Sequence, residues 1–412
     1  MRLLTSLLTI ALLLACVLPH AAAAQRSAPP PTCTRESGLV LPPGFCAVVV
    51  AQDLGRVRNL TVLPNGDVLA AQANGGVVAL RDTDGDGRAD VRKSFADQGG
   101  TGIGFHGGYL WFAPNDRVVR WKWSVGDLSP TSDPEVIVQG LPASGHSAKT
   151  IAFLGGDTLI VNIGSATNSC QLRDRSSRSP GVDPCAELEG RAGLWRFSTG
   201  RLQQRQGDGT RFATGLRNAE ALAVQPATGR LYAVPHGRDQ LGDNWGYTDA
   251  QNAELPAEEF DQVNAGDDFG WPYCYFDQQQ GKKVLSPEYG GNGTDIGRCA
   301  SKKSPLIGFP GHWAPMALVF YDGAQFPAKY RGGAFLAFHG SWNRAPLPQQ
   351  GYRVVFIPFG SDGMPTGKYE TFATASKGET AMRPAGVAVG PDGSLYIGDE
   401  QSGTIWRVMA TE

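Results

Sequence analysis

A short hydrophobic pattern recurs six times along the chain. Each copy is a turn glycine followed by a short apolar run, and the copies start at Gly66, Gly108, Gly156, Gly229, Gly333 and Gly393. Another apolar run precedes each copy, at residues 60–63, 102–105, 150–153, 221–224, 316–320 and 386–389. Two short apolar runs joined by a glycine turn predict a β-hairpin. The pattern therefore predicts six hairpins.

A third apolar run follows most of the hairpins, at residues 77–80, 118–123, 194–197, 352–359 and 404–408. Repeated sheets of three or four strands are typical of a β-propeller. We therefore predict an all-β, six-bladed propeller. Residues 45–52 are expected to close the ring by pairing with residues 404–408. The alternative, a pair of β-sandwiches, would need evenly spaced strands without these repeating triplets.

Composition supports a modular fold and excludes one class of partner. The 412 residues include 54 Gly and 28 Pro, which interrupt helices and mark turns. A chain of this length rarely folds around a single hydrophobic core. The blades of a propeller pack face to face and so form several smaller cores. The 37 basic and 39 acidic residues give a formal net charge of −2, so no basic excess indicates nucleic-acid binding.

The N-terminus has the layout of a secretory signal. Arg2 precedes a mostly apolar run that ends in four alanines, Ala21 to Ala24. We expect a signal peptide at residues 1–24, a linker at 25–37 and the catalytic propeller at 38–412, in a periplasmic or secreted protein. A lipoprotein site at Cys16 is the alternative. No later run approaches a membrane span.

Six cysteines would remain after removal of the signal, an even number that predicts three disulfides in an exported protein. They are Cys33, Cys46, Cys170, Cys185, Cys274 and Cys299. Fifteen connectivities are possible. Pairing of sequence neighbours favours Cys33–Cys46, Cys170–Cys185 and Cys274–Cys299. The last two lie in the long gaps between hairpins, so they would pin insertions.

Propeller topology collects one set of loops around the central channel. Residues just before each first strand and just after each second strand meet there, in what we call the funnel. Its candidate ligand residues are Lys149, Arg217, Asn218, Gly237, Arg238, Trp342, Asn343, Arg344 and Arg383. Because arginine donors form a fork that suits planar carboxylates, we expect a flat polyanion. His146 is the candidate general base, since histidine titrates near neutrality.

Six stretches resemble the soluble pyrroloquinoline quinone (PQQ)-dependent sugar dehydrogenases, most closely the sorbosone and pyranose dehydrogenase branch. They are GHSAKTIAF (145–153), GLRNAEALAV (215–224), PHGRDQLGDNW (235–245), EEFDQVNAGDDFGWPYCY (258–275), FHGSWNR (338–344) and MRPAGVAVGPDGSLYIGDE (382–400). The resemblance runs from about residue 38 to 408. Individually the motifs are generic, but the ordered set is specific.

This resemblance implies a role for each matched position. The family has PQQ flat over the channel with Ca²⁺ beside its quinone, and oxidises aldoses or related carbonyl hydrates. His146 matches the catalytic base and Arg217 the arginine that polarises the quinone carbonyl. Asn218 matches a cofactor contact, and Arg383 a partner of a PQQ carboxylate. The backbone carbonyls of Gly237 and Arg238 match the ligands of the cofactor calcium.

Two departures limit what the resemblance implies. Glucose-oxidising members have a lysine where this chain has Trp342-Asn343-Arg344. Arg344 could replace that charge, and Trp342 could stack on the cofactor or the sugar. Arg238 stands where those enzymes have proline, which keeps the carbonyl but puts the rigidity of the loop in doubt. The substrate is therefore not inherited from the resemblance.

Two acidic motifs are candidates for further calcium ions. Asp82, Asp84, Asp86 and Asp90 alternate around a turn glycine, as in the first half of an EF-hand loop. Lys93 stands at the twelfth position, so a complete EF-hand is excluded and a structural DxDxDG calcium loop is expected, on the face opposite the funnel. Glu258 and Glu259, with Asp261, could bind another calcium near the cofactor, although acidic loop residues are often only solvated.

These observations favour an exported dehydrogenase that uses PQQ and Ca²⁺ to oxidise a sugar or a sugar-derived aldehyde. Its electron acceptor, a quinone or a cytochrome, is not specified by the sequence. A propeller hydrolase of the lactonase type is the enzyme alternative, and it predicts carboxylate and Asn ligands at the channel. A secreted propeller that only binds a carbohydrate or protein is the other, and it predicts no PQQ uptake.

Overall fold

The structure is a computed structural model that describes residue 33 and residues 37–411. The expected signal peptide, the alternative lipoprotein site at Cys16 and most of the expected linker lie outside the described residues. Within the described residues, no helix is long and apolar enough to cross a membrane.

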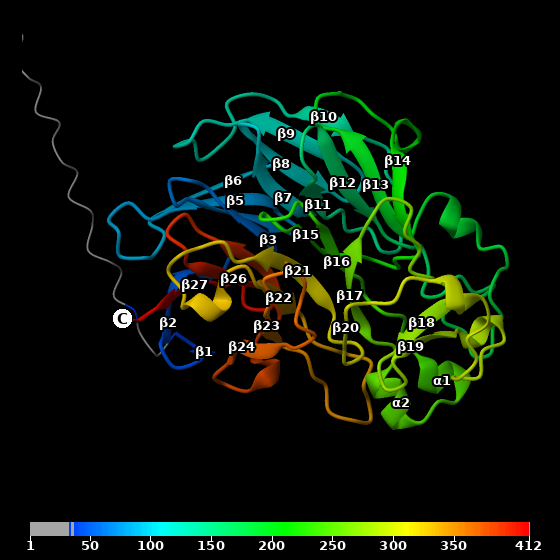
Figure 1. Ribbon diagram of the computed structural model, residues 1–412. Helices are drawn as coiled ribbons and strands as arrows, with labels where there is room; N and C mark the ends of the chain where they lie inside the picture. Colours follow the sequence, from blue (N-terminus) through cyan, green and yellow to red (C-terminus); the bar gives the residue numbers. More distant parts are fainter. Residues whose placement is uncertain (1–32, 34–36, 412) are drawn as a thin grey trace, which may run out of the picture.

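Six antiparallel sheets form the blades of a propeller, as the hairpin repeat predicts (Figure 1). Blade 1 contains β3 (Val57–Val62), β4 (Val68–Gln72), β5 (Gly76–Arg81) and β6 (Val91–Phe95), and blade 2 contains β7 (Gly100–His106), β8 (Tyr109–Pro114), β9 (Val118–Lys122) and β10 (Glu135–Val138). Blade 3 contains β11 (Ile151–Phe153), β12 (Thr158–Ile163), β13 (Gly193–Ser198) and β14 (Thr210–Thr214). Blade 4 contains β15 (Ala221–Val224), β16 (Leu231–Val234), β17 (Glu258–Val263) and β20 (Ile307–Phe309). Blade 5 contains β21 (Pro315–Phe320), β22 (Ala334–Phe338), β23 (Arg353–Ile357) and β24 (Glu370–Ala375), and blade 6 contains β25 (Pro384–Val389), β26 (Leu395–Asp399) and β27 (Ile405–Ala410).

The N-terminal strands complete the last two blades. β2 (Phe45–Ala51) pairs with β27, which confirms the predicted closure, and β1 (Leu39–Val40) pairs with β24. Around the axis, the inner strands β3, β7, β11, β15, β21 and β25 each contact the inner strand of the next blade, and β25 contacts β3. The ring is therefore closed, and the starts of all six inner strands share one face.

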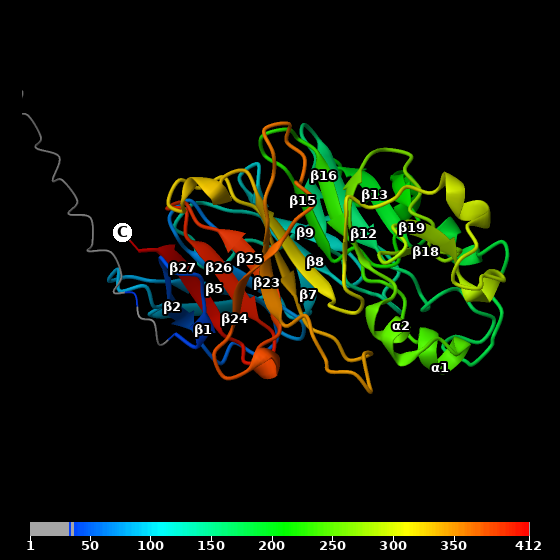
Figure 2. The ribbon, with the colours of Figure 1, turned by 60° about the horizontal axis from the view of Figure 1, so that its bottom comes forward.

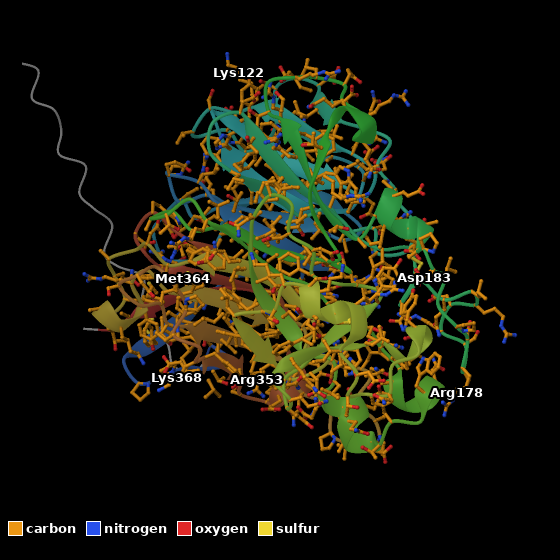
Figure 3. The ribbon with its side chains drawn as sticks, turned by 45° about the vertical axis from the view of Figure 1, so that its right-hand side comes forward. Lys122, Arg178, Asp183, Arg353, Met364 and Lys368 are labelled. Atoms are coloured by element: carbon orange, nitrogen blue, oxygen red, sulfur yellow. A yellow bond between two sulfur atoms is a disulfide. The ribbon has the colours of Figure 1, made fainter. Side chains whose placement is uncertain are left out.

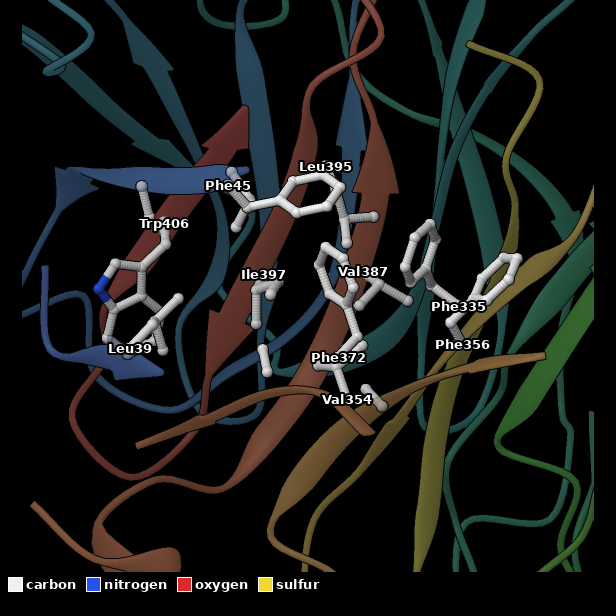
Figure 4. Close-up of a cluster of buried hydrophobic side chains, with 14 of the residues drawn as sticks. Leu39, Phe45, Phe335, Val354, Phe356, Phe372, Val387, Leu395, Ile397 and Trp406 are labelled. Atoms are coloured by element: carbon white, nitrogen blue, oxygen red, sulfur yellow. The ribbon is translucent and has the colours of Figure 1, made fainter. Parts of the chain in front are cut away.

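Apolar side chains fill the space between neighbouring blades. Between blades 5 and 6, Phe335, Phe356 and Phe372 meet Phe45 and Leu395 in one buried cluster (Figure 4). Successive side chains of a strand point to opposite faces, so each blade contributes apolar residues to the cores on both of its sides. This packing holds the blades rigidly around the axis.

Insertions and short helices gather beside blades 3 and 4. The insertion in blade 4 carries β18 (Cys274–Asp277) and β19 (Lys282–Leu285), and α1 (Leu241–Trp245) and α2 (Asp249–Glu254) follow β16 (Figure 2). Figure 3 places Arg178 and Asp183 of the β12–β13 loop at the same edge, opposite Met364 and Lys368. Short 3₁₀ turns lie at Ala186–Glu189, Gln206–Asp208, Pro287–Tyr289, Gly297–Ser301, Ala328–Tyr330 and Glu379–Ala381.

All three predicted disulfides are present: Cys33–Cys46, Cys170–Cys185 and Cys274–Cys299. The second ties the β12–β13 loop and the third ties the blade 4 insertion, so both pin insertions as expected. Blade 4 is where the sequence pattern was incomplete. Its third strand, β17, reads EEFDQV and is too acidic to be recognised as an apolar run, and its fourth strand follows the insertion.

Candidate functional site

The expected site residues lie at the face where the inner strands begin. His146 and Lys149 precede β11, Arg217 and Asn218 precede β15, and Arg383 precedes β25. Gly237 and Arg238 follow β16, and residues 342–344 follow β22. The topology therefore brings these segments to one end of the central channel.

His146 is held in one tautomer by Ser165. Its Nδ1 lies 3.0 Å from the carbonyl oxygen of Ser165 and 2.9 Å from the Oγ of the same residue. A carbonyl only accepts, so Nδ1 carries the proton and Nε2 keeps its lone pair. Burial, with a contribution from the charge of Arg217, lowers the pKa of His146 to about 3. The imidazole is therefore neutral at physiological pH, with a lone pair on Nε2. Its pKa in this structure lies well below the near-neutral value on which the sequence-based choice of this base rested, because the ring is buried.

The loop that carries His146 is anchored on both sides. Gly145 has φ +65°, and a side chain there would overlap Ala166, so only glycine fits. The Arg191 guanidinium donates to the carbonyl (2.8 Å) and the hydroxyl (2.9 Å) of Ser144. These contacts fix the approach of the chain to the histidine.

Arg217 is buried and nearly saturated by internal partners. Its Nε donates to the carbonyl of Asn168 (3.1 Å), and its Nη1 donates to that of Gly237 (2.9 Å). Its Nη2 donates to Oδ1 of Asn168 (3.0 Å) and to Oδ2 of Asp239 (3.1 Å). Four of the five N–H donors of the guanidinium are thus used, and one on Nη1 is left for a ligand.

The Gly237–Arg238 loop is rigid although it lacks the proline. Arg238 donates to both oxygens of Glu288 (2.5 and 2.6 Å) and to the carbonyl of Asp239 (2.9 Å). Glu288 also accepts from the indole of Trp245 (2.9 Å). This buried ion pair restrains the loop where proline would otherwise do so. The replacement of proline by Arg238 therefore does not leave the loop without a restraint.

The carbonyls of this loop have capacity for a cation. The Gly237 oxygen accepts only from Arg217, which leaves its second lone pair, and no donor in residues 37–411 pairs with the Arg238 oxygen. Gly237 also lacks room for a side chain, because a Cβ would lie 2.9 Å from Pro256 Cγ. Two adjacent carbonyl oxygens suit calcium, which prefers oxygen ligands.

Lys149 and Asn218 precede the inner strands β11 and β15, as His146 precedes β11, and both are buried. The buried ammonium of Lys149 donates to the carbonyl of Ser147 (2.6 Å). Burial and the charge of Arg191 lower its pKa to about 7. The amide of Asn218 accepts from Asn162 (2.9 Å) and donates to Glu220 (3.0 Å), which leaves one N–H and one oxygen lone pair of the amide.

Arg383 contacts His339, which in turn lies beside Glu400. Its Nη1 donates to Nδ1 of His339 (3.1 Å), and its guanidinium lies 5.1 Å above the ring of Tyr352. Nε2 of His339 lies 2.8 Å from Glu400, which also pairs with Arg58 (3.1 Å). Burial would raise the pKa of Glu400, but His339 and Arg58 lower it to about 2.

Most funnel arginines are therefore neutralised within the protein. Arg217 pairs with Asp239, Arg238 with Glu288, and Arg58 with Glu400. Among the positively charged candidate cofactor residues in the described part of the chain, only Lys149 and Arg383 form no ion pair with a carboxylate. These two carry the charge that remains available for an anionic ligand.

The segment after β22 divides into an anchor and an exposed tip. Arg344 is buried and donates to Glu254 (2.6 Å), to Gly311 (3.2 Å) and to the carbonyl of Ala253. Asn343 is buried, and its carbonyl accepts from Asn252 (3.0 Å). Trp342 is 60% exposed. Arg344 thus fastens the loop to α2 and does not offer a free charge.

Glu258 and Glu259 do not share a site, because adjacent residues of β17 point to opposite faces. Glu258 accepts from the backbone of Gly237 (2.8 Å) and of Ala314 (3.2 Å). Glu259 pairs with Lys283 (2.6 Å). The carboxylate of Asp261, on the Glu259 side, is buried without a hydrogen-bond partner, and burial raises its pKa well above the usual range. Glu258 therefore supports the Gly237 loop, whereas Glu259 belongs to a separate cluster.

The Asp82 loop joins the third and fourth strands of blade 1, as expected, and so lies at the end of the blade opposite the funnel. Ligand oxygens of Asp82, Asp84 and Asp86 lie within 4.8 Å of one another, and all three side chains are exposed. Asp90 turns back to accept from the backbone and hydroxyl of Thr83 (2.7 and 2.8 Å). The structure brings three of the four expected ligands together.

The sequence pattern did not identify Asp239, Asn168 or Ser165 as site residues. Asp239 and Asn168 hold Arg217, and Ser165 sets the tautomer of His146. Burial alone would raise the pKa of Asp239, but the interactions with His312 and Arg217 hold it well below the usual range. A cluster of arginines needs counter-charges, and that need was the one available indication of Asp239.

Comparisons with known proteins identify the family. The family model described as TrAA12-like matches residues 39–411. The chain belongs to the TrAA12-like family. Among curated proteins, a PQQ-dependent pyranose dehydrogenase of Coprinopsis cinerea is 23% identical over 420 residues, covering 89% of this chain and 54% of that protein. An uncharacterised protein of Borreliella burgdorferi is 28% identical over 205 residues, covering 48% of each chain. The chain thus spans about half the length of the curated relatives it matches.

Solved structures share the fold of this TrAA12-like chain. The iodide structure of the Trichoderma reesei family AA12 enzyme has a TM-score of 0.75 at 18% identity, covering 91% of this chain and 98% of that one. The holo PQQ domain of the Coprinopsis cinerea pyranose dehydrogenase has a TM-score of 0.74 at 19% identity, covering 92% and 98%. The apo aldose sugar dehydrogenase of Escherichia coli has a TM-score of 0.60 at 15% identity, covering 89% and 99%. At these identities the likeness concerns the fold.

Proposed function

We propose that the protein is an exported dehydrogenase that uses PQQ and Ca²⁺ to oxidise a sugar or a sugar-derived aldehyde. The observation that carries this proposal is the neutral His146, whose Nε2 lone pair is set by Ser165 at the same end of the channel as Arg217. Membership of the TrAA12-like family, with a PQQ-dependent pyranose dehydrogenase among its relatives, supports the same reaction class.

The residues around the funnel fit a flat, trianionic cofactor and a calcium ion. The Gly237 and Arg238 carbonyls would hold the calcium, and Arg383 and Lys149 would pair with cofactor carboxylates. The one free N–H of Arg217 would donate to a quinone oxygen. Trp342, Asn343 and Arg344 belong to the wall of the funnel, where Arg344 anchors the loop.

His146 would act as the general base. Its Nε2 would remove the proton from the substrate hydroxyl, and the hydrogen bond from Nδ1 to Ser165 would stabilise the imidazolium that forms. A bound PQQ would supply the hydride acceptor for the same substrate carbon, and a bound calcium ion would supply a Lewis acid beside it. The substrate thus loses one proton to the protein and two electrons with the hydride to the cofactor. An electron acceptor, a quinone or a cytochrome, then has to reoxidise the cofactor.

The ligand residues argue against the lactonase alternative. That alternative requires carboxylate and amide ligands that converge on the channel. Among the described residues, the Asp82, Asp84 and Asp86 loop is the one acidic group placed to hold a metal, and it lies away from the funnel. The channel carboxylates Glu220 and Glu400 both face Arg58 (3.9 and 3.1 Å).

Reconstitution tests the proposal. PQQ and Ca²⁺ are added to the apoprotein, and dye reduction is followed with aldoses, sorbosone and simple alcohols. We expect a change in quinone absorbance on binding and sugar-dependent dye reduction. Absence of both would overturn the proposal and leave the two alternatives, a lactonase-type hydrolase and a non-catalytic binding propeller.

A further inference from the structure

We infer that Trp342 and Arg175 form a carbohydrate subsite at the mouth of the funnel, for the sugar ring next to the one that reacts. The inference deepens the proposed function, since the reacting ring is placed at His146 only under that proposal. The subsite itself is argued from the contacts of these two side chains.

Trp342 is an exposed aromatic on a rigid support. Its side chain is 60% exposed, whereas its neighbours Ser341, Asn343 and Arg344 are buried. Four hydrogen bonds from the Arg344 guanidinium fix the loop to α2 and neighbouring backbone. A large apolar ring held in solvent on a fixed loop is a feature of binding sites.

Arg175 connects this ring to the funnel. Its guanidinium carbon lies 6.0 Å from the centre of the Trp342 ring. Its Nη2 donates to Oδ2 of Asp239 (3.0 Å), the same oxygen that accepts from Arg217 (3.1 Å). Trp342 is therefore separated from Arg217 by two side chains. Under the proposed function, we therefore place the tryptophan beyond the reacting ring and beside its neighbour.

Arg175 retains donors for a ligand. Of its five N–H groups, one is used by Asp239 and one by Gln240 (3.2 Å). Its Nε lies 3.9 Å from Asp174, too far for a hydrogen bond. The side chain is 36% exposed. Three N–H donors thus remain on a partly exposed side chain that is already oriented by its other contacts.

The loop that presents Arg175 is pre-organised. The Cys170–Cys185 disulfide closes it, and the backbone N–H of Arg175 donates to Gln171 (2.8 Å). At its far end, Arg178 donates through its backbone to Asn244 of α1 (3.1 Å). Little ordering is then needed on binding, which favours affinity.

A pyranose ring matches this pair of side chains. One face of the ring presents C–H groups, which pack on an indole, and its edge carries neighbouring hydroxyls, which a guanidinium fork can bind. The indole of Trp342 would pack on the C–H face of the pyranose, and the guanidinium of Arg175 would donate to the hydroxyls at its edge. We therefore expect a disaccharide to gain affinity here that a monosaccharide does not.

The test compares cellobiose with D-glucose on the PQQ- and Ca²⁺-loaded protein. Trp342→Ala should raise KM for cellobiose about tenfold more than it raises KM for glucose. Trp342→Phe should restore most of the affinity. Arg175→Ala should raise KM for cellobiose severalfold. Leu172→Ser is the matched control, since Leu172 is 68% exposed on the same loop, and it should leave all parameters unchanged.

A binding measurement separates this inference from the proposed function. Cellobiose should quench tryptophan fluorescence of the wild type without turnover, and the quench should disappear in Trp342→Phe. Quenching without dye reduction would keep the subsite and overturn the dehydrogenase. Turnover with an unchanged cellobiose KM in Trp342→Ala would overturn the subsite. An effect of Trp342→Ala on the KM of the electron acceptor alone would also overturn it and assign this surface to the acceptor.

Discussion

Arg217 donates an N–H to the backbone carbonyl of Gly237 at 2.9 Å, although the two residues are 20 positions apart. The arginine proposed to contact the quinone and the carbonyl proposed to bind calcium are thus one hydrogen-bonded unit. A calcium ion on Gly237 would lie beside a guanidinium, and the two positive charges would repel each other. The carboxylate of Asp239, 3.1 Å from Arg217, is placed to offset both charges.

Asp239→Asn should therefore weaken calcium binding at the cofactor site. The amide keeps the shape of the side chain but removes its negative charge, so we expect calcium affinity to fall at least tenfold. Calcium titration of PQQ reconstitution measures the effect. Asp243→Asn, an exposed neighbour on α1, is the control, and equal calcium affinities in the two variants would contradict the role given to Asp239.

His146→Ala should reduce kcat by about 10²- to 10⁴-fold, the usual contribution of a general base. PQQ affinity should change little, because the base contacts the substrate hydroxyl. Single-turnover reduction of bound PQQ, followed by absorbance, measures the step directly. Turnover similar to that of the wild type would show that another group is the base.

Arg383 and Arg344 should respond differently to replacement by alanine. Arg383 pairs with no carboxylate, so Arg383→Ala should weaken PQQ binding by about 10- to 100-fold, the range for one charged hydrogen bond. Arg344 is buried and donates to backbone carbonyls as well as to the partly exposed Glu254, so Arg344→Ala should cost about 1–3 kcal/mol of unfolding free energy. Equilibrium PQQ titration and denaturant unfolding separate the two effects. The opposite assignment of effects would show that Arg344 is the cofactor contact.

PQQ affinity should fall as the pH rises through about 7. Burial and Arg191 lower the pKa of Lys149 to about 7, so the free folded protein loses this positive charge above that pH. An anionic ligand favours the ammonium, and its affinity should decrease by up to about tenfold per pH unit above 7. Lys149→Met should abolish the dependence.

The lowered pKa of Lys149 also makes the stability of the fold depend on pH. Between pH 7 and the ordinary lysine pKa of 10.5, the unfolded chain binds the proton that the folded chain has lost. The contribution of Lys149 to the free energy of unfolding should therefore rise with pH in this window. PQQ affinity in the wild type that does not vary between pH 6 and 9 would contradict a charged contact from Lys149.

The Asp82 loop should stabilise the protein when it binds calcium. The double variant Asp82→Asn with Asp84→Asn should lose the rise in Tm that calcium gives to the PQQ-free protein. At a calcium concentration 100 times Kd, that rise corresponds to about 2.7 kcal/mol. Turnover at saturating PQQ and calcium should be unchanged, because the loop lies opposite the funnel. Asp133→Asn, an exposed acidic residue in blade 2, is the control.

Local pattern was sufficient for the blades because strand formation depends on nearby residues. A turn glycine and a short apolar run specify each hairpin, and two of the three disulfides join cysteines only 13 and 15 residues apart. Blade 4 was incomplete because Glu258 and Glu259 make its third strand look polar. Their charges are tolerated in the fold because Gly237 and Ala314 donate to one and Lys283 pairs with the other.

The sequence by itself thus determined the six-bladed architecture, the end of the channel where the candidate residues meet, and their types. Only the tertiary structure decided which charges remain available there. The acidic partners of Arg217, Arg238 and Arg344 lie 22, 50 and 90 positions away, so no local pattern could pair them. These carboxylates neutralise the three arginines, which leaves Lys149 and Arg383 for an anion. The reason is that a buried charge is stable only beside an opposite charge, and the fold decides which residues become neighbours.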